Sequence, residues 1–305
     1  MNSKTKYKIT NEQVAKIFET AGFGTPTAVK PLDEGWYNSV VIVAVDKAKY
    51  VLKVAPHPSV AVLTYEEGIM TKELKYYALL REKTNINTPK ILLEDFTRTV
   101  IPCDYFVMEF LEGSVLDKIK LSPEEKKRVD GEILQILAQH HAITGEGFGY
   151  EQMGLERNWY LALKKMNRAM IDDCRRFGKS CPLGKKLNKY IEQHREILES
   201  VSSQFVNYDL HGGNIMYCEG KLFVFDLERA FWGDYTGDFI ARALTPPQSF
   251  TREEKIRFYL LMGYLAVMMY TEKFSRYTPF NKIWWLDVGG TILYGDKAFG
   301  ALRRI

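Results

Sequence analysis

Apolar and β-branched residues gather in short runs in the first third of the chain, and turn-forming residues separate these runs. Such a pattern is typical of strands connected by short loops. The runs that predict strands cover residues 27–32, 40–45, 50–54, 91–96 and 105–110. We therefore expect a sheet in the N-terminal part of the chain.

Apolar residues at three- and four-residue spacing predict helices in other segments. The first helix has a capping box of Thr10 and Gln13 and a stop at Gly22, and we expect it to pack against the sheet. Ser122 and Pro123 begin another capped helix, which we expect at the centre of a helical region. The helical patterns cover residues 10–22, about 65–82, 122–140, 151–199 and 251–273.

One stretch, residues 206–228, combines a polar loop with a predicted hairpin. The loop holds Asp209 and Asn214 and leads into a short apolar strand. A two-residue turn of Glu and Gly then reverses the chain, because Gly takes positive φ readily, and the second strand ends in Asp226. The hairpin should therefore bring Asp226 back beside Asp209 and Asn214.

Three oxygen-bearing side chains at one point suit a hard cation such as Mg²⁺. Asn214 and Asp226 are the predicted metal ligands, and Asp209 is the predicted base that accepts a proton from an attacking hydroxyl. The spacing Asp-x-x-x-x-Asn, with a second Asp on the next hairpin, is the arrangement that kinases use. The alternative is an ordinary polar loop before a hairpin.

The motif Asp209-Leu-His-Gly-Gly-Asn214, followed by Asp226-Leu-Glu, resembles the aminoglycoside phosphotransferase family, which includes choline-kinase-like and other small-molecule kinases. The family loop commonly reads His-Gly-Asp-Leu-His-x-Gly-Asn, so this chain departs from it at Asn207 and Tyr208. Asn207 can still hydrogen-bond the loop, but it cannot carry the charge of a histidine. The resemblance covers nearly the whole chain.

This resemblance implies an α+β, two-lobed, protein-kinase-like fold. The N-terminal nucleotide-binding lobe, residues 1–112, would hold an antiparallel sheet with one crossing helix. The larger C-terminal lobe, residues 113–305, would be mostly helical and carry catalysis, with the segment of about 151–199 building the substrate site. In the family, the residue at the position of Asp238 ties the loop after the metal-binding Asp to this lobe.

Lys53 lies in an otherwise apolar strand run, where an ammonium needs a partner. In kinases, a Lys on the third strand contacts the α- and β-phosphates and pairs with a Glu of the next helix. We predict Glu73 as this partner, because its neighbours on the helix would face the sheet, and keep Glu66 as the alternative. The competing interpretation is a Lys on the solvent face of the strand.

The loop before the second strand would fold over the nucleotide phosphates, which gives Gly35 and Ser39 a predicted binding role. A single Gly is a weak signal, and the alternative is a plain hairpin loop. At the predicted hinge between lobes, the adenine base would bond to the carbonyl of Glu109 and the N–H of Leu111. Met108 would pack on the base, or serve as a core residue.

Composition bounds the class of protein. The chain has 305 residues, is 46% hydrophobic and 26% charged, and carries a net charge of +4, which is too small to indicate nucleic-acid binding. Its four cysteines have neither C-x-x-C nor zinc-ligand spacing, so we expect reduced thiols in the cytoplasm. No signal peptide is visible, and the longest apolar run, residues 258–270, is too short to span a bilayer.

Charge in the predicted substrate segment bears on the acceptor. Residues 156 to 195 carry eleven Lys or Arg against four Asp or Glu. A polycationic aminoglycoside prefers an acidic pocket, so this imbalance favours a neutral or anionic acceptor. The alternative is that these charges lie on solvated helix faces. Aminoglycosides, other antibiotics, amino alcohols and sugars all remain candidates.

The predicted reaction is transfer of the γ-phosphoryl group of ATP, or of GTP as the alternative, to a hydroxyl of a small molecule with Mg²⁺. A nucleotide-binding pseudokinase is the main competitor, although Lys53, Asp209, Asn214 and Asp226 are all intact. A protein kinase is disfavoured because Leu-Glu follows Asp226 and no Ala-Pro-Glu segment is evident. A basic nucleic-acid-binding protein would need a recognisable motif, and none is present.

Overall fold

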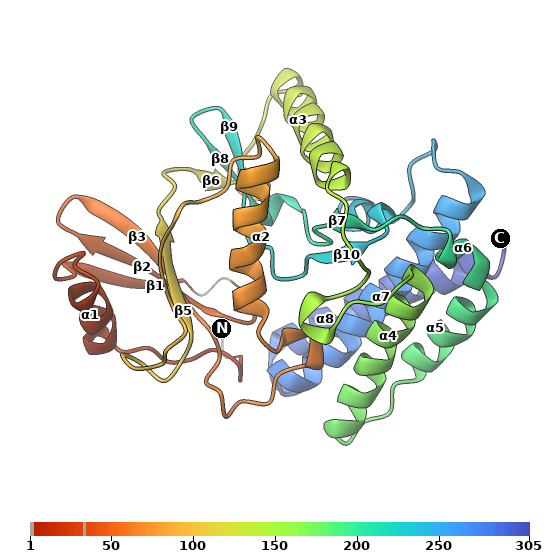
Figure 1. Ribbon diagram of the computed structural model, residues 1–305, viewed down its shortest axis with the longest axis horizontal. Coiled ribbons are helices and arrows are strands. Elements are labelled where there is room, and N and C mark those ends of the chain that lie inside the picture. The colour runs from red at the N-terminus through yellow and green to blue at the C-terminus, as the bar shows by residue number, and fades with distance from the viewer. Residues whose placement is uncertain (1–2, 33–34) are drawn as a thin grey trace. The chain divides into compact units, whose positions relative to one another are not determined.

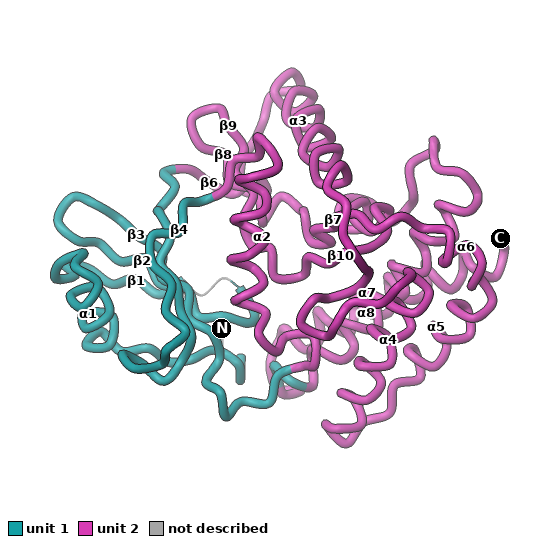
Figure 2. Tube along the Cα trace, viewed as in Figure 1, with its two compact units in different colours: residues 1–62, 89–112, 275–277 teal, residues 63–88, 113–274, 278–305 magenta. Residues whose placement is uncertain are grey.

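The computed structural model describes residues 3–32 and 35–305, and the chain separates into two compact units (Figure 2). The first unit comprises residues 1–62, 89–112 and 275–277, and the second comprises the remainder. The lobes expected from the sequence share the boundary between residues 112 and 113. Residues 63–88, expected in the N-terminal lobe, cluster with the second unit. The division into two lobes stays a prediction.

An antiparallel five-stranded sheet in the order β1-β2-β3-β5-β4 dominates the first unit (Figure 1). Its strands are β1 (Ala28–Leu32), β2 (Ser39–Val45), β3 (Ala48–Val54), β4 (Ile91–Asp95) and β5 (Tyr105–Glu109). Every strand predicted for this region is present, with ends that differ by a residue or two. The predicted antiparallel sheet is therefore confirmed.

Helix α1 (Asn11–Thr20) packs on this sheet as predicted. Both hydrogen bonds of the Thr10–Gln13 capping box are formed, so the first turn is stabilised by its own side chains. Val14, Ile17 and Phe18 are buried against side chains of β2, β3 and β5. Burial of each such side chain contributes about 1.5–3 kcal/mol, which fixes the helix to the sheet.

Helices make up most of the second unit (Figure 1). They are α2 (Ile69–Lys83), α3 (Pro123–Ala142), α4 (Trp159–Arg176), α5 (Pro182–Gln193), α6 (Arg195–Glu199), α7 (Arg252–Arg276), whose last two residues cluster with the first unit, and α8 (Lys282–Leu302). Short strands form two small sheets, namely β6 (Ser114–Val115), β8 (Ile215–Cys218) and β9 (Lys221–Val224) in one, and β7 (Gln204–Val206) with β10 (Phe231–Gly233) in the other.

One expectation needs correction. The helix expected from about residue 65 begins at Ile69, because Gly68 has a φ of 69° and separates it from a short 3₁₀ turn, Thr64–Glu66. A left-handed residue cannot continue an α-helix, and Gly adopts that conformation without a steric penalty. In α8, Trp284 packs on Phe274, whereas Trp285 is 62% exposed.

An aromatic cluster in the second unit supports the loop that carries Asp209. Trp159 of α4 stacks on Phe231 of β10 with ring centroids 5.4 Å apart. Phe231 in turn contacts the ring of Tyr208 edge-on at 5.1 Å, and all three side chains are buried. Aromatic pairs of this kind add about 0.5–1.5 kcal/mol each beyond burial. Buried aromatic packing therefore supports the loop that carries Asp209.

His140 of α3 should make stability depend on pH. The ring is fully buried against Phe205, and neither ring nitrogen has a hydrogen-bond partner within the described residues. Burial lowers the pKa of His140 to about 4. Between pH 6.5 and 4, His140 of the unfolded chain binds a proton that the buried ring of the folded chain does not bind. The free energy of unfolding therefore falls as the pH decreases toward 4.

We expect His140 to cost about 2 kcal/mol of unfolding free energy between pH 7.5 and pH 5. Urea unfolding at both pH values measures this loss, and His140→Leu should reduce it by that amount. An identical pH dependence in the variant and the natural chain would contradict the assignment.

Two observations bear on the predicted compartment. Within residues 3–32 and 35–305, no helix is both long enough and apolar enough to cross a bilayer. The four cysteines are free thiols, as predicted, and burial raises the pKa of Cys103 to about 11. A cytoplasmic location stays a prediction.

Candidate active site

The hairpin predicted around the polar loop is present. Strands β8 and β9 pair in antiparallel register from Ile215 opposite Val224 to Cys218 opposite Lys221. The two turn residues, Glu219 and Gly220, both have positive φ, 48° and 80°, as a tight two-residue hairpin requires. The end of β9 consequently returns to the start of β8.

Asn214 links the two ends of this hairpin. Its Nδ2 donates to the backbone carbonyl of Asp209 at 3.0 Å, and its own backbone carbonyl accepts from the N–H of Phe225 at 3.1 Å. The loop that contains Asp209 is thereby tied to the residue before Asp226. Because Nδ2 makes this bond, Oδ1 is the atom of the Asn214 side chain that remains for a cation.

The carboxylate of Asp209 is oriented on one side and partly open on the other. Its Oδ1 lies 3.5 Å from Nη1 of Arg229 and 3.9 Å from Nε2 of His211, and the side chain is 26% exposed. The backbone N–H of Asp209 donates to Oδ1 of Asn207 at 3.1 Å, so Asn207 does hydrogen-bond the loop. An oriented, accessible carboxylate is what a general base requires.

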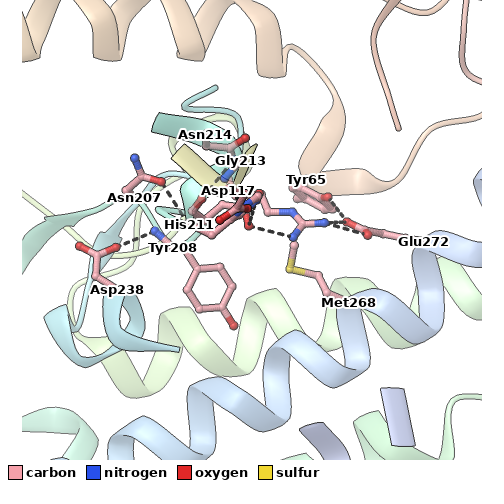
Figure 3. Close-up of polar contacts among 12 residues, drawn as sticks. Tyr65, Asp117, Asn207, Tyr208, His211, Gly213, Asn214, Asp238, Met268 and Glu272 are labelled. Carbon is pink, nitrogen blue, oxygen red and sulfur yellow. Dashed lines mark hydrogen bonds and ion pairs between the residues drawn. The ribbon is translucent and has the colours of Figure 1, made fainter. Parts of the chain in front are cut away.

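Arg229 connects Asp209 to Glu272, a buried acidic residue that Figure 3 shows beside Tyr65. Its Nη2 donates to Oε1 and Oε2 of Glu272 on α7 at 3.1 and 3.0 Å, and the hydroxyl of Tyr65 donates to Oε1 at 2.6 Å. Burial opposes the charge of Arg229, but the carboxylates of Glu272 and Asp209 outweigh it and raise the pKa of the guanidinium. The guanidinium is therefore a permanent cation beside Asp209.

Two residues that flank the site have left-handed backbone. Tyr208 has a φ of 66° and Asp226 a φ of 62°, a conformation that costs a non-glycine residue about 1–2 kcal/mol. The N–H of Tyr208 donates to Asp238 at 2.7 Å, and that of Asp226 donates to the hydroxyl of Tyr77 at 3.0 Å. The family commonly has Gly at the position of Tyr208, which fits this φ.

Asp238 has the structural role that the resemblance implied. It is fully buried, and besides the N–H of Tyr208 it bonds to Nε2 of His141 at 2.8 Å. The hydroxyl of Tyr208 donates to the carbonyl of Leu261 at 2.7 Å. These bonds and the aromatic cluster offset the unfavourable φ of Tyr208, so the departure from Gly is accommodated by packing.

Three carboxylates gather beside the hairpin. Glu73 of α2, Asp226 and Glu228 can each place an oxygen within 4.8 Å of the others, and Glu73 is only 1% exposed. Carboxylates this close repel one another unless a cation lies near them. Hard oxygen donors fit Mg²⁺, and Asn214 supplies a further oxygen nearby, so the residues present suit this ion.

Glu66 and Glu73, the two candidates for the partner of Lys53, have different surroundings. Glu66, the alternative partner for Lys53, accepts a hydrogen bond from the N–H of Leu63 at 2.8 Å and thus caps a local turn. Glu73 lies in the carboxylate cluster with Asp226 and Glu228. The pairing of Lys53 with Glu73 stays a prediction.

The predicted phosphate-binding residues Lys53, Gly35 and Ser39 lie in the first unit. Lys53 is 6% exposed on β3, opposite Phe106, and its Nζ lies 5.9 Å from the centre of that ring. Gly35 has a φ of 86°, a conformation that favours Gly. The hydroxyl of Ser39 donates to the carbonyl of Tyr7 at 2.6 Å, so its proton is already used. Residues 33–34 of the predicted loop lie outside the described residues.

The predicted hinge follows the end of a strand. Met108 and Glu109 are the last residues of β5, and both are half-buried. The N–H of Glu109 donates to the carbonyl of Lys90 at 2.9 Å. Leu111 lies beyond the strand, where its N–H is outside the ladder. A role for these three residues in holding adenine stays a prediction.

Sequence reasoning missed several residues of the site. Glu228 was noted only as a difference from the protein-kinase motif, and Arg229, Glu272 and Tyr65 were not singled out. A signal for Glu228 and Arg229 was available, because they lie two and three positions after Asp226, a predicted metal ligand. No local signal marks Glu272 or Tyr65, since Glu272 is 43 positions from Arg229 and 207 from Tyr65.

The family of this chain follows from comparison with known proteins. Residues 28–269 match the profile of the phosphotransferase enzyme family. The chain belongs to this family. No curated protein matches the sequence. The kinase-like fold of this phosphotransferase is shared by solved structures of low sequence identity, which extend over almost its whole length.

Three solved structures illustrate the likeness. A candidate aminoglycoside phosphotransferase of Ralstonia eutropha JMP134 has a TM-score of 0.64 at 16% identity, covering 97% of this chain and 98% of its own. A candidate fructosamine-3-kinase of Haemophilus somnus 129PT has a TM-score of 0.65 at 13% identity, covering 94% and 97%. A thermostable mutant of aminoglycoside phosphotransferase APH(4)-Ia, bound to AMP-PNP and hygromycin B, has a TM-score of 0.64 at 14% identity, covering 94% and 97%.

Proposed function

We propose that this phosphotransferase moves the γ-phosphoryl group of ATP to a hydroxyl of a small molecule. The observation that carries the proposal is the loop in which Asn214 joins Asp209 to the end of β9, next to Asp226. Membership of the phosphotransferase enzyme family supports the same reaction. The APH(4)-Ia structure, which holds an ATP analogue and an aminoglycoside, supports a nucleotide and a small acceptor as its two substrates.

In the proposed reaction, Asp209 orients the acceptor hydroxyl and accepts its proton. The acceptor oxygen bonds to the γ-phosphorus as the bond from this phosphorus to the bridging oxygen breaks, and ADP leaves. Arg229 holds the Asp209 carboxylate in place through its contact at 3.5 Å. Most of the rate would come from positioning and charge stabilisation, because the transition state is loose.

The cation would be held by Asp226 and Asn214, with Glu73 and Glu228 beside them. When bound, Mg²⁺ supplies charge neutralisation for the phosphate oxygens. The Tyr77 hydroxyl accepts a hydrogen bond from the N–H of Asp226 and so stabilises its left-handed backbone. These residues therefore present oxygens in a defined arrangement without needing to reorganise.

The first unit would bind the nucleotide. Lys53 would contact the α- and β-phosphates, with Glu73 as its predicted partner. The backbone of Glu109 and Leu111 would hold the adenine, with Met108 against the base. Because the hydroxyl of Ser39 already donates to Tyr7, we assign it a smaller part than Lys53.

Tyr294 of α8 is the best candidate for an acceptor contact. It is half-buried, and after burial itself the charge of Asp209 is the largest influence that raises the pKa of its hydroxyl. A tyrosine offers an apolar face and one hydrogen bond and carries no negative charge at neutral pH. This favours a neutral acceptor such as a sugar, or a single cation such as an amino alcohol, over a polycation.

The experiment that tests the function is ATP and GTP consumption with Mg²⁺ across a panel of acceptors. The panel holds aminoglycosides, macrolides, choline, ethanolamine, homoserine and sugars. Acceptor-dependent release of ADP, with a phosphorylated product of the right mass, would establish the reaction. Tight binding of Mg·ATP without transfer to any acceptor would instead favour a nucleotide-binding pseudokinase.

Replacing Asp226 by Asn should raise the Mg²⁺ concentration needed for half-maximal rate by at least about tenfold, because the change removes a charged ligand. Asn is the replacement of choice, since it tolerates the left-handed φ that Asp226 adopts. The measurement is the initial rate as a function of Mg²⁺. Asp296→Asn, on the exposed face of α8, is the matched control. An unchanged Mg²⁺ dependence would remove Asp226 from the metal site.

A further inference from the structure

A groove lies between α4 and α5, which pack side by side in the second unit (Figure 1). Its volume is about 660 Å³, within the range of small-molecule sites. Leu161 and Ile171 contribute apolar surface, and Asn188 contributes an amide. None of these residues belongs to the proposed catalytic site.

Cations dominate the lining of this groove. One carboxylate, that of Glu156, faces six cationic side chains. The six are Lys164, Lys165, Arg168, Arg175, Lys185 and Lys189. They come from both helices, so positive charge borders the groove on two sides.

Neighbouring carboxylates neutralise only part of this charge. Arg168 and Arg175 share one carboxylate, that of Asp172, at 2.9 and 2.7 Å. Lys165 pairs with Glu156 at 2.9 Å, and Lys164 pairs with Glu192 at 2.6 Å. Three carboxylates therefore serve six cations, an excess nearly as large as the net charge of +4 of the whole chain.

Lys185 and Lys189 carry this excess. Both are exposed on α5, and neither forms an ion pair with any residue that the structure describes. Lys185 ends the first turn of α5, where the positive end of the helix dipole disfavours a cation, and no acidic residue in that turn compensates. Helix stability does not explain a Lys at this position, whereas attraction of an anion does.

We propose that this groove binds a small molecule that carries several phosphate groups. Lys ammonium groups bind phosphate as mobile point charges, and Arg adds a planar fork of donors. Among the described residues, no aromatic side chain lines the groove, so it lacks the stacking surface that single-stranded nucleic acids use. Its concave shape suits a compact ligand better than the flat face of an anionic membrane. The inference does not depend on the proposed phosphotransfer.

The test is a calorimetric titration of the full chain with myo-inositol hexakisphosphate, without Mg²⁺ or nucleotide. The natural chain should bind one equivalent, more weakly as salt rises, since salt screens the attraction. Lys185→Glu/Lys189→Glu should weaken binding by on the order of tenfold or more, because two attractive charges become repulsive. Lys126→Glu/Lys127→Glu on α3 makes the same change of net charge at exposed positions away from the groove and should change affinity less than about twofold.

Several outcomes would overturn the proposal. Equal weakening in both double variants would show a general effect of net charge, and unchanged affinity in the groove variant would place the probe elsewhere. Absence of binding to the natural chain would also exclude the site. Tighter binding of a single-stranded oligonucleotide or of phosphatidylserine vesicles, lost in the same groove variant, would assign the groove to a different class of ligand. Matched melting temperatures would confirm that both variants are folded.

Discussion

Replacing Asp209 by Asn should lower kcat by about 10²- to 10⁴-fold, or about 3–5 kcal/mol of transition-state stabilisation. The amide has nearly the same shape as the carboxylate, but it cannot accept the proton of the acceptor hydroxyl. It also presents no charge to Arg229, which lies 3.5 Å away. The measurement is single-turnover phosphoryl transfer with the acceptor that the panel identifies.

Nucleotide binding separates this effect from a folding defect. The affinity for Mg·ATP should change little in Asp209→Asn, because the proposed ligands of the metal and of the phosphates are untouched. Asp296→Asn makes the same chemical change at an exposed position and should keep the full rate. Full turnover in Asp209→Asn would show that another group, or none, accepts the proton.

Replacing Arg229 by Met should destabilise the fold by about 3–5 kcal/mol, because it removes one partner of a buried ion pair. The Glu272 carboxylate is only 3% exposed and accepts two bonds from this guanidinium. Without these two bonds, the buried Glu272 carboxylate no longer has the Arg229 guanidinium beside it to compensate for the water that it lost on folding. Denaturant unfolding of the natural chain and the variant measures the difference.

A second replacement tests this explanation. Arg229→Met/Glu272→Met removes both charges and should be more stable than Arg229→Met alone, because no buried carboxylate is left behind. If the double variant is at least as unstable as the single one, loss of packing rather than the unpaired charge explains the effect.

The same pair of residues links stability to catalysis. Arg229→Met should also reduce kcat, since Asp209 loses the contact that orients it. The reduction should be small when Asn already replaces Asp209, because the carboxylate that Arg229 orients is then absent. A double-mutant cycle on kcat measures this coupling. Full additivity would mean that Arg229 does not act through Asp209.

Much of the local structure could be predicted from the sequence. The capping box at Thr10 and Gln13 and the turn of Glu219 and Gly220 formed as expected. Both depend on residues within a few positions of one another, so their physical cause lies entirely in the local sequence. The expected place of Asp226 beside the loop followed from the same hairpin.

Other features were hidden from local patterns. The break at Gly68 was missed, because a glycine within a periodic run is compatible with a continuous helix until its φ is known. Trp285 is 62% exposed, which no local pattern indicates. An aromatic residue in an apolar helix usually packs inward, and only the neighbouring elements decide which face of the helix they cover.

The sequence by itself determined the motif of Asp209, Asn214 and Asp226, the antiparallel strands and the family resemblance. These depend on spacing along the chain and on short-range backbone preferences. Only the tertiary structure decided that Glu73 joins Asp226 and Glu228, that Arg229 bridges Asp209 and Glu272, and that cations of α4 and α5 face one groove. Such contacts join residues that are distant along the chain, and they arise only when packing brings separate helices and loops together.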